Sequence, residues 1–379
     1  MRRVAALAPA LAALLAVAAL VAPPGGAQGP GGPEPTGFFP HAIAVGDLNG
    51  DGVPDVVVPA AAERKVSVLI SDGKGGFVGN DAYPAGIGPT WVELGDFDGD
   101  GKLDLVVTNT GGGSLTLYYG DGAGRFGNPQ EITGIRGPVS AVAVDVNRDG
   151  RLDLVVAQAA DSKLLVLENR GGRFVPGPAY PVGHGPHIVT RADLNRDGIA
   201  DLLVGTFARH TISVLLGRRD GTFLDAREIP SGRFPHYMVV GDWNRDGHPD
   251  LAVACAGDDA VVLYQGDGTG DLRKSGTLPT EANPHGLVGA DVNGDGLLDL
   301  IVSTRSSGIH SVFLGDGRGG FTPGPRIRLD ADIIALAAVD LDRDGRVDLA
   351  MVSASHHAVI TYRGDGQGGF APFHQAAGR

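Results

Sequence analysis

A nine-residue acidic block recurs seven times along this 379-residue chain, and it constrains the fold more than any other feature. The blocks read DLNGDGVPD, DFDGDGKLD, DVNRDGRLD, DLNRDGIAD, DWNRDGHPD, DVNGDGLLD and DLDRDGRVD, and they begin at Asp47, Asp96, Asp145, Asp193, Asp242, Asp291 and Asp340. Successive blocks start 49 residues apart, except for one interval of 48 residues. So constant a period indicates one structural unit repeated in phase, with each unit burying its apolar face against its neighbours.

The order of segments within each unit is also constant. A short apolar segment precedes the acidic block, a β-branched run such as 55–58 follows it, and a third apolar run such as 65–70 leads into a glycine-rich turn. A last short segment then leads to the next unit. Four short strands per unit, separated by turn residues and repeated seven times, are typical of a seven-bladed β-propeller. We therefore predict an all-β fold with four-stranded antiparallel blades over residues 38–379.

The same order predicts how the ring closes. The segment before each acidic block is the innermost strand, so the chain starts on an inner strand near Phe38 and ends on an outer strand over 370–377. Nothing in this order indicates that a strand is exchanged between the two ends. We expect the first and last blades to close the ring by packing alone.

Composition and the chain start narrow the class of protein. Glycine supplies 61 of 379 residues and the net charge is -13, which exclude a helical bundle and a protein that holds nucleic acid through a basic surface. Residues 1–27, with Arg2 and Arg3 before an apolar run, are expected to be a secretory signal peptide, followed by a Pro/Gly-rich linker over 28–37. A transmembrane anchor is the alternative. We expect an exported protein, periplasmic, cell-surface or secreted, with no stable membrane span once the signal is removed.

Each acidic block has the pattern of a metal-binding loop. Positions 1, 3 and 5 carry Asp or Asn, position 6 is Gly, and position 9 is Asp. Ca²⁺ prefers six to eight oxygen ligands, which such a loop can supply from these side chains and from the main-chain carbonyl of position 7. The absence of His and Cys side chains from the set favours Ca²⁺ over Zn²⁺, and up to seven ions are predicted. The alternative is a set of acidic hairpins that hold no ion.

The predicted ligands occupy positions 1, 3, 5, 7 and 9 of each block, and they are Asp47, Asn49, Asp51, Val53, Asp55; Asp96, Asp98, Asp100, Lys102, Asp104; Asp145, Asn147, Asp149, Arg151, Asp153; Asp193, Asn195, Asp197, Ile199, Asp201; Asp242, Asn244, Asp246, His248, Asp250; Asp291, Asn293, Asp295, Leu297, Asp299; and Asp340, Asp342, Asp344, Arg346, Asp348.

The acidic blocks and the glycine-rich turns together resemble the FG-GAP or VCBS repeat family, which is related to the N-terminal propeller of integrin α chains. Six of the turns end in phenylalanine, at Phe77, Phe126, Phe174, Phe223, Phe321 and Phe370. The resemblance covers about residues 38–379. It implies a seven-bladed propeller with Ca²⁺ in the loops between first and second strands on the lower face, and adhesion or ligand binding through the upper face. Integrins bind metal in only some blades, whereas every blade here carries the full set.

A second group of side chains is expected on the upper face. His41, His187, His236 and His285 occupy equivalent positions at the start of the innermost strand, six residues before the first Asp of the acidic block. Loops that open on the same face add further basic residues and aromatics. The candidate ligand-binding residues are His41, Trp91, His187, Arg209, His210, His236, Tyr237, His285, Arg305, His356 and His357.

Three interpretations of this group stay open. The imidazoles either cap neighbouring backbone carbonyls and are structural, or bind an anionic ligand with protonation near pH 6.5 as a switch, or hold a transition metal. Nearby aromatics, including Phe207 and Phe234, can stack on a sugar or pack between blades. Glu93 and Arg191 are polar insertions in inner strands that the pattern leaves unexplained.

The pattern favours a binding protein over an enzyme. No nucleophile elbow, phosphate loop or zinc-protease motif occurs in the sequence, and the Asp pairs belong to a turn repeated seven times. We expect a non-catalytic module for a protein or glycan ligand, with no nucleic-acid partner. The alternative is an extracellular polysaccharide hydrolase or lyase whose site is the His-rich mouth of the channel.

Overall fold

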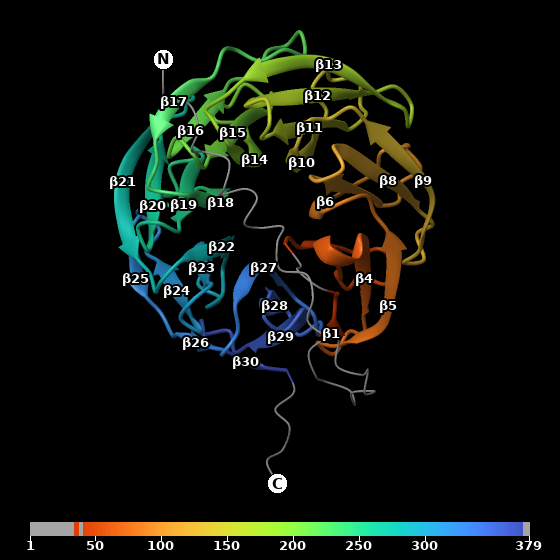
Figure 1. Cartoon of the computed structure of the whole chain (residues 1–379). Helices are drawn as coiled ribbons and strands as arrows, with labels where there is room; N and C mark the ends of the chain where they lie inside the picture. The colour runs from red at the N-terminus through yellow and green to blue at the C-terminus, as the bar shows by residue number, and fades with distance from the viewer. Residues whose placement is uncertain (1–33, 38–40, 374–379) are drawn as a thin grey trace, which may run out of the picture.

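The computed structural model describes residues 34–37 and 41–373 and has the predicted seven-bladed β-propeller fold (Figure 1). The predicted signal peptide, the first part of the linker and residues 38–40 and 374–379 lie outside the described residues. Each blade is a sheet whose strands follow one another in chain order from the central channel to the rim. No helix within the described residues has the length and apolar character needed to cross a membrane.

The first four blades have the following strands. Blade one comprises β2 (Ala44–Gly46), β3 (Asp55–Ala60), β4 (Lys65–Ser71) and β5 (Phe77–Pro84), with a short 3₁₀ turn, η1 (Ala61–Glu63), after β3. Blade two comprises β6 (Pro89–Gly95), β7 (Asp104–Asn109), β8 (Ser114–Gly120) and β9 (Phe126–Thr133). Blade three comprises β10 (Pro138–Val144), β11 (Asp153–Gln158), β12 (Lys163–Asn169) and β13 (Phe174–Pro181). Blade four comprises β14 (Pro186–Ala192), β15 (Asp201–Thr206), β16 (Thr211–Leu215) and β17 (Arg227–Pro230).

The remaining three blades follow the same order. Blade five comprises β18 (Pro235–Gly241), β19 (Asp250–Cys255), β20 (Ala260–Gly266) and β21 (Leu272–Pro279). Blade six comprises β22 (Pro284–Ala290), β23 (Asp299–Thr304), β24 (Ile309–Gly315), β25 (Phe321–Pro323) and β26 (Ile327–Arg328). Blade seven comprises β27 (Ile333–Val339), β28 (Asp348–Ser353), β29 (Ala358–Gly364) and β30 (Phe370–Pro372), and it also takes up β1 (Glu34–Pro35).

The core lies between the blades. The second strand of every blade is buried along its whole length, because neighbouring blades cover both of its faces. Seven clusters of buried side chains are found, one at each contact between adjacent blades. One of them packs Val56 and Val58 of blade one against Val352 and Val359 of blade seven. Each blade therefore buries its apolar residues only against its neighbours, as the repeat period predicts.

The expected closure by packing alone is wrong. β1 pairs antiparallel with β29, with Glu34 opposite Val359 and Pro35 opposite Ala358, and Figure 1 shows β1 beside β29 of the last blade. Beyond the strand, Thr36 N donates to His357 O at 2.8 Å. Because β30 pairs only with Tyr362–Gly364, the other end of β29 is left for β1. The end of the predicted linker is thus part of the propeller, and a two-residue strand among prolines and glycines carried no periodic signal.

Candidate functional site

The aspartate at position 9 of each acidic block is a buried structural clamp. In blade one the Oδ2 atom of Asp55 accepts a hydrogen bond from Leu48 N at 2.9 Å, and its Oδ1 atom accepts one from Ser71 N at 2.8 Å. The same two bonds recur in the other six blades at Asp104, Asp153, Asp201, Asp250, Asp299 and Asp348. All seven side chains are fully buried. Each clamp fixes the start of the loop to the end of the third strand.

The side chains at positions 1 and 5 shape the loop itself. Asp47 accepts hydrogen bonds from Asp51 N through Oδ1 at 3.1 Å and from Gly52 N through Oδ2 at 2.9 Å. Asp51 Oδ1 in turn accepts a bond from Val53 N at 2.8 Å. Gly52 has a φ of 83°, a left-handed conformation that glycine adopts without strain, and the glycine at position 6 of every block has a positive φ. The loop therefore curls around its own carboxylates.

These loops can hold metal ions. Carboxylate oxygens of Asp96, Asp98 and Asp100 lie within 4.8 Å of one another, and the same holds for Asp340, Asp342 and Asp348. The other five blades carry Asn at position 3. In blade seven the Oδ1 atom of Asp340 is buried and has no hydrogen-bond partner in the described structure. A converging set of oxygen donors with an unsatisfied buried oxygen suits a hard divalent cation.

Charge repulsion within the loops supports the same interpretation. Burial, together with the neighbouring carboxylates of Asp51 and Asp47, raises the pKa of Asp55 to about 6. Burial and the carboxylates of Asp342 and Asp344 raise the pKa of Asp348 to about 6 as well. A bound cation would favour the ionised form of such crowded carboxylates.

In four blades the glycine-rich turn donates a backbone hydrogen bond to the acidic block of the preceding blade. Gly124 N of blade two donates to Leu48 O of blade one at 2.9 Å, and Gly75 N of blade one donates to Leu341 O of blade seven at 3.3 Å. Gly319 and Gly368 make the equivalent bonds for blades six and seven. This contact explains why the sequence repeats the turn in phase with the acidic block. The bond from Gly75 to Leu341 also helps to close the ring.

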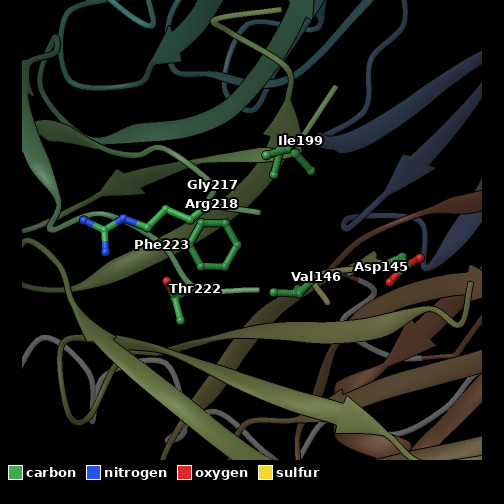
Figure 2. A pocket seen from close by; sticks show the side chains of 8 residues that line it. Asp145, Val146, Ile199, Gly217, Arg218, Thr222 and Phe223 are labelled. Carbon is green, nitrogen blue, oxygen red and sulfur yellow. The ribbon is translucent and has the colours of Figure 1, made fainter. Parts of the chain in front are cut away.

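In blade four the turn lies against the acidic block of blade three without this hydrogen bond among the described residues, and a small cavity lies beside it. The turn folds back on itself, since Gly221 N donates to Arg218 O at 3.1 Å. Figure 2 shows the cavity beside it, about 10 Å³ in volume and lined by residues that include Val146, Ile199 and Phe223. This volume holds at most about one water molecule, which excludes a ligand site there. A wider opening of about 350 Å³ lies nearby along Arg191–Ala192 and Gly198–Ala200.

On the upper face the structure brings the predicted histidines together. The ring centroids of His187 and His236 are 5.1 Å apart, and those of His236 and His285 are 4.1 Å apart. His41 lies close enough to His187 and Arg305 for both to disfavour its charged form. The inner strand carries these residues at one end and the acidic blocks at the other, so the imidazoles and carboxylates lie at opposite ends of the channel. We call His41, His187, His236 and His285 the imidazole cluster.

Part of the imidazole cluster is structural. His285 Nδ1 lies 2.7 Å from Ile334 O, which occupies the equivalent position in the next blade. Thr90 Oγ1 makes the corresponding contact with Val139 O at 3.4 Å. The interpretation that these imidazoles cap neighbouring carbonyls is confirmed for His285, whereas the buried Nδ1 atom of His187 has no hydrogen-bond partner among the described residues.

Burial keeps the imidazoles neutral. It lowers the pKa of His285 to about 3 and that of His41 to about 4, with Arg305 and other imidazoles acting in the same direction. It also lowers the pKa of His236 well below its usual value, with His285 as the next cause. Burial therefore disfavours the alternative interpretation of protonation near pH 6.5 for these groups, and the sequence showed the histidines but not their burial.

Two predicted aromatic residues meet inside the channel. Trp91 of blade two and Tyr237 of blade five have ring centroids 6.0 Å apart, although their strands belong to distant blades. Tyr237 also lies 6.2 Å from His285. These rings pack with several of the inter-blade clusters, so they fill the channel beside the imidazole cluster.

The other predicted residues of this face are distributed around it. His210 packs against Phe234 at 4.8 Å, and Arg209 is exposed on the same loop. Arg305 lies near the imidazole cluster and pairs with Asp332 at 3.4 Å. His356 bonds to Ser353 and Ser355, and His357 lies near Glu63 and pairs its backbone with Thr36. His357 thus belongs to the contact between blades seven and one, whereas the bonds of His356 stay within blade seven.

The fold and these loops define the protein as a seven-bladed β-propeller with a repeated acidic loop that can hold metal ions. A family model described as FG-GAP-like repeat matches residues 47–107, 96–156, 145–204, 193–253, 242–302 and 291–351. These matches run through all seven acidic blocks. The chain belongs to the FG-GAP-like repeat family.

Solved structures share the fold at low sequence identity. BBS1N in complex with ARL6DN has a TM-score of 0.63 and 16% identity, over 86% of this chain and 93% of that one. A lectin from Agrocybe aegerita that recognises non-reducing terminal N-acetylglucosamine has a TM-score of 0.55 and 19% identity, over 89% of each chain. A putative 6-phosphogluconolactonase from Bacteroides uniformis has a TM-score of 0.61 and 13% identity, over 88% of this chain and 95% of that one. Comparison with curated protein sequences found no match.

Proposed function

We propose that this protein is an exported, calcium-stabilised, non-catalytic propeller that binds a protein or glycan ligand with its upper face. The main observation behind the proposal is that two kinds of side chain lie at opposite ends of the channel. The carboxylates gather at one end of the inner strands, and the imidazoles and aromatic rings of blades four to six gather at the other. One end is suited to cations, and the other offers rings and hydrogen-bond donors to a ligand.

Calcium is the metal that the loop chemistry favours. The candidate donors are carboxylate and amide oxygens at positions 1, 3 and 5, the position 7 carbonyl and the position 9 carboxylate, which are hard ligands. The position 9 aspartate already accepts two backbone hydrogen bonds, so it also holds the loop in place for the other ligands. When bound, Ca²⁺ would neutralise carboxylates that otherwise repel one another and would add its binding free energy to that of folding.

Three features support a binding role without catalysis. The carboxylates of the acidic blocks form a repeated set bonded to their own loops, and catalytic groups are usually unique within a repeat array. His285 bonds to a backbone carbonyl of the next blade. Proteins of similar fold include BBS1N, solved in complex with a partner protein, and a glycan-recognising lectin. These examples show that the same fold can serve protein and glycan ligands.

Export is part of the proposal and rests on the sequence of residues 1–27 alone. The alternative of a polysaccharide hydrolase or lyase keeps the same location and would place the chemistry at His236, whose ring lies between those of His187 and His285.

The experiment is a binding screen of the calcium-loaded protein on immobilised glycans and on extracellular proteins, run in parallel with product assays on the glycans that bind. We expect saturable binding without product formation. Turnover of a polysaccharide that is lost in His236→Asn, while Asp220→Asn on the lower face retains it, would establish the enzyme instead. Binding to neither class of ligand would also contradict the proposal.

A further inference from the structure

A comparison of equivalent positions in the seven blades shows which residues the shared fold does not require. The residue that follows the second strand is Ala or Thr in five blades, namely Ala61, Thr110, Ala159, Ala256 and Ala354. It is Phe207 in blade four and Arg305 in blade six. The residue before the inner-strand proline is Gly88, Gly137 and Gly185 in blades two to four, but Phe39 in blade one, Phe234 in blade five and Asn283 in blade six. Because blades with Ala, Thr or Gly at these positions have the same fold, the fold does not require Phe207, Phe234 or Arg305.

The backbone of Phe234 is strained. Its φ is 56°, close to the values of 64°, 62° and 71° at the equivalent glycines, and a bulky residue in this left-handed region is strained by about 1–2 kcal/mol. The backbone is held there by a bond from Phe234 N to His210 Nδ1 at 3.1 Å and one from Ala256 N to Phe234 O at 3.1 Å. The side chain is nevertheless 38% exposed. Burial in the core is therefore an incomplete reason to keep a strained phenylalanine.

Phe234 is the outer end of a continuous row of rings. Its centroid lies 4.7 Å from that of Phe207, with the planes 33° apart, and Phe207 lies 5.2 Å from His236. His210 packs edge-on against Phe234 at 4.8 Å and an angle of 85°. We call Phe207, His210, Phe234 and His236 the aromatic platform. It runs from the exposed Phe234, which directly precedes the inner strand β18 of blade five, to the imidazole cluster.

Fixed polar groups lie at the outer edge of the aromatic platform. Asp258 accepts hydrogen bonds from Arg233 N and Arg233 Nε, both at 2.6 Å, and Arg233 also bonds to Gly257 O. Since His210 Nδ1 accepts the Phe234 N–H, the ring proton of neutral His210 is on Nε2, which is then a donor. An exposed aromatic face beside oriented donors and acceptors is the arrangement that a sugar ring needs, because its C–H face is apolar and its hydroxyls are polar.

The inner edge of the platform is basic. Arg305 N donates to Asn283 O at 3.0 Å, so Arg305 lies on the upper face of blade six beside the segment that leads to His285. Its guanidinium is charged, whereas burial keeps the neighbouring imidazoles of His236 and His285 neutral. The Arg305 side chain is 45% exposed, and its ion pair with Asp332 is 3.4 Å long. A fixed guanidinium charge disfavours a metal cation beside these imidazoles and favours a carboxylate.

We propose that the aromatic platform binds a sugar residue that carries a carboxylate, with the sugar ring on Phe234 and Phe207 and the carboxylate towards Arg305. This inference rests on the proposed function and narrows its ligand to an acidic glycan. It assigns the specificity to three residues that depart from the repeat, so the residue found in other blades gives a natural variant for each: Phe207→Ala, Phe234→Gly and Arg305→Ala.

The test uses matched ligands. Trisaccharides of galacturonate, mannuronate and glucuronate, each as the free acid and as its methyl ester, are titrated calorimetrically into the calcium-loaded protein at pH 7 without further free calcium. We expect at least one acid to bind about tenfold more tightly than its ester. Phe207→Ala and Phe234→Gly weaken the binding of the acid about tenfold or more, and Arg305→Ala reduces the affinity for the acid to that for the ester.

The variants also control for folding. Phe234→Gly relieves the strained φ, so its melting temperature should equal or exceed that of the wild type. Ile87→Ala removes another exposed apolar side chain, from the loop before the inner strand of blade two, and should leave binding unchanged. Equal affinity for acid and ester, no binding of any acid, or binding that survives Phe234→Gly would overturn the inference. If instead a protein or a neutral glycan binds, and Phe234→Gly does not weaken that binding, this inference is overturned but the proposed function is supported.

Discussion

Glu93 of blade two and Arg191 of blade four bond to opposite sides of one residue, Ala143 of blade three. Glu93 Oε1 accepts a hydrogen bond from Ala143 N at 3.0 Å, and Arg191 Nη1 donates to Ala143 O. The inner strand of each blade turns a free backbone edge towards the channel, and buried backbone groups require partners. The two polar insertions thus complete the edge of a neighbouring strand and join three blades.

Replacing either side chain should destabilise the propeller. Burial raises the pKa of Glu93 to about 7, while Arg191 acts in the opposite direction. Glu93→Met should lower the free energy of unfolding by about 1–3 kcal/mol, because Ala143 N loses its partner and the charge of Arg191 loses its counterpart. Urea unfolding in excess calcium measures the change. If the two residues act as one bridge, the double variant Glu93→Met/Arg191→Met loses less than the sum of the single losses, and additive losses would show that they act independently.

His285 should make stability depend on pH. Its folded pKa of about 3 lies below the unfolded value of 6.5, so its contribution is complete above pH 6.5 and declines as the pH falls towards 3. Between pH 7.5 and 5 the stability of the wild type relative to His285→Asn should fall by about 2 kcal/mol. Both proteins contain the same acidic loops, so the effect of loop titration on stability cancels in the difference. Parallel pH profiles would contradict the buried neutral state of His285.

Positions 5 and 9 of one acidic block should respond differently to calcium. Asp153→Asn places an amide donor against backbone N–H groups, and we expect a loss of about 1–3 kcal/mol both in calcium and in excess chelator. Asp149→Asn keeps an oxygen for Arg151 N but removes the exposed ion pair between Asp149 and the Arg151 guanidinium, so its loss should be small in chelator and clearly larger in calcium. Chemical unfolding under both conditions separates the clamp from the ligand. A loss at Asp149 that is equal in chelator would show that this residue is only structural.

β1 and the neighbouring Thr36 should stabilise the closed ring. A protein that begins at residue 38 lacks β1, the bond from Thr36 N to His357 O and the bond from Ser67 Oγ to Thr36 O at 3.0 Å. With about 0.5–1.5 kcal/mol for each hydrogen bond, we expect a loss of a few kcal/mol relative to a protein that begins at residue 32. Thermal unfolding compares the two, and equal midpoints would mean that packing alone closes the ring.

The blades were predictable because each repeats the same local signals in phase. The acidic block before a β-branched run, as at Asp55, predicted both the loop and the buried second strand, and the period predicted the number of blades. The two-residue strand β1 was not predictable, since Glu34 and Pro35 lie in a Pro/Gly-rich segment without alternation. Its partner strand β29 belongs to the last blade, so no local pattern in the sequence links the two.

The candidate sites were predictable in part. Equivalent positions on neighbouring inner strands placed His236 and His285 near each other, and the structure confirms that proximity. Contacts between distant blades had no signal in the repeat. Trp91 meets Tyr237 because the channel is narrow enough for large rings from both sides to touch, and Glu93 reaches Ala143 because blade three presents a free strand edge there.

The most direct test of the account is to count the calcium ions that the folded protein binds and to measure their effect on unfolding. Native mass spectrometry of protein dialysed against calcium should show several bound ions, up to seven, and excess chelator should lower the unfolding midpoint markedly, since the loop carboxylates then repel one another. A calcium-equilibrated protein that carries no ion and unfolds at the same temperature with and without chelator would contradict the account.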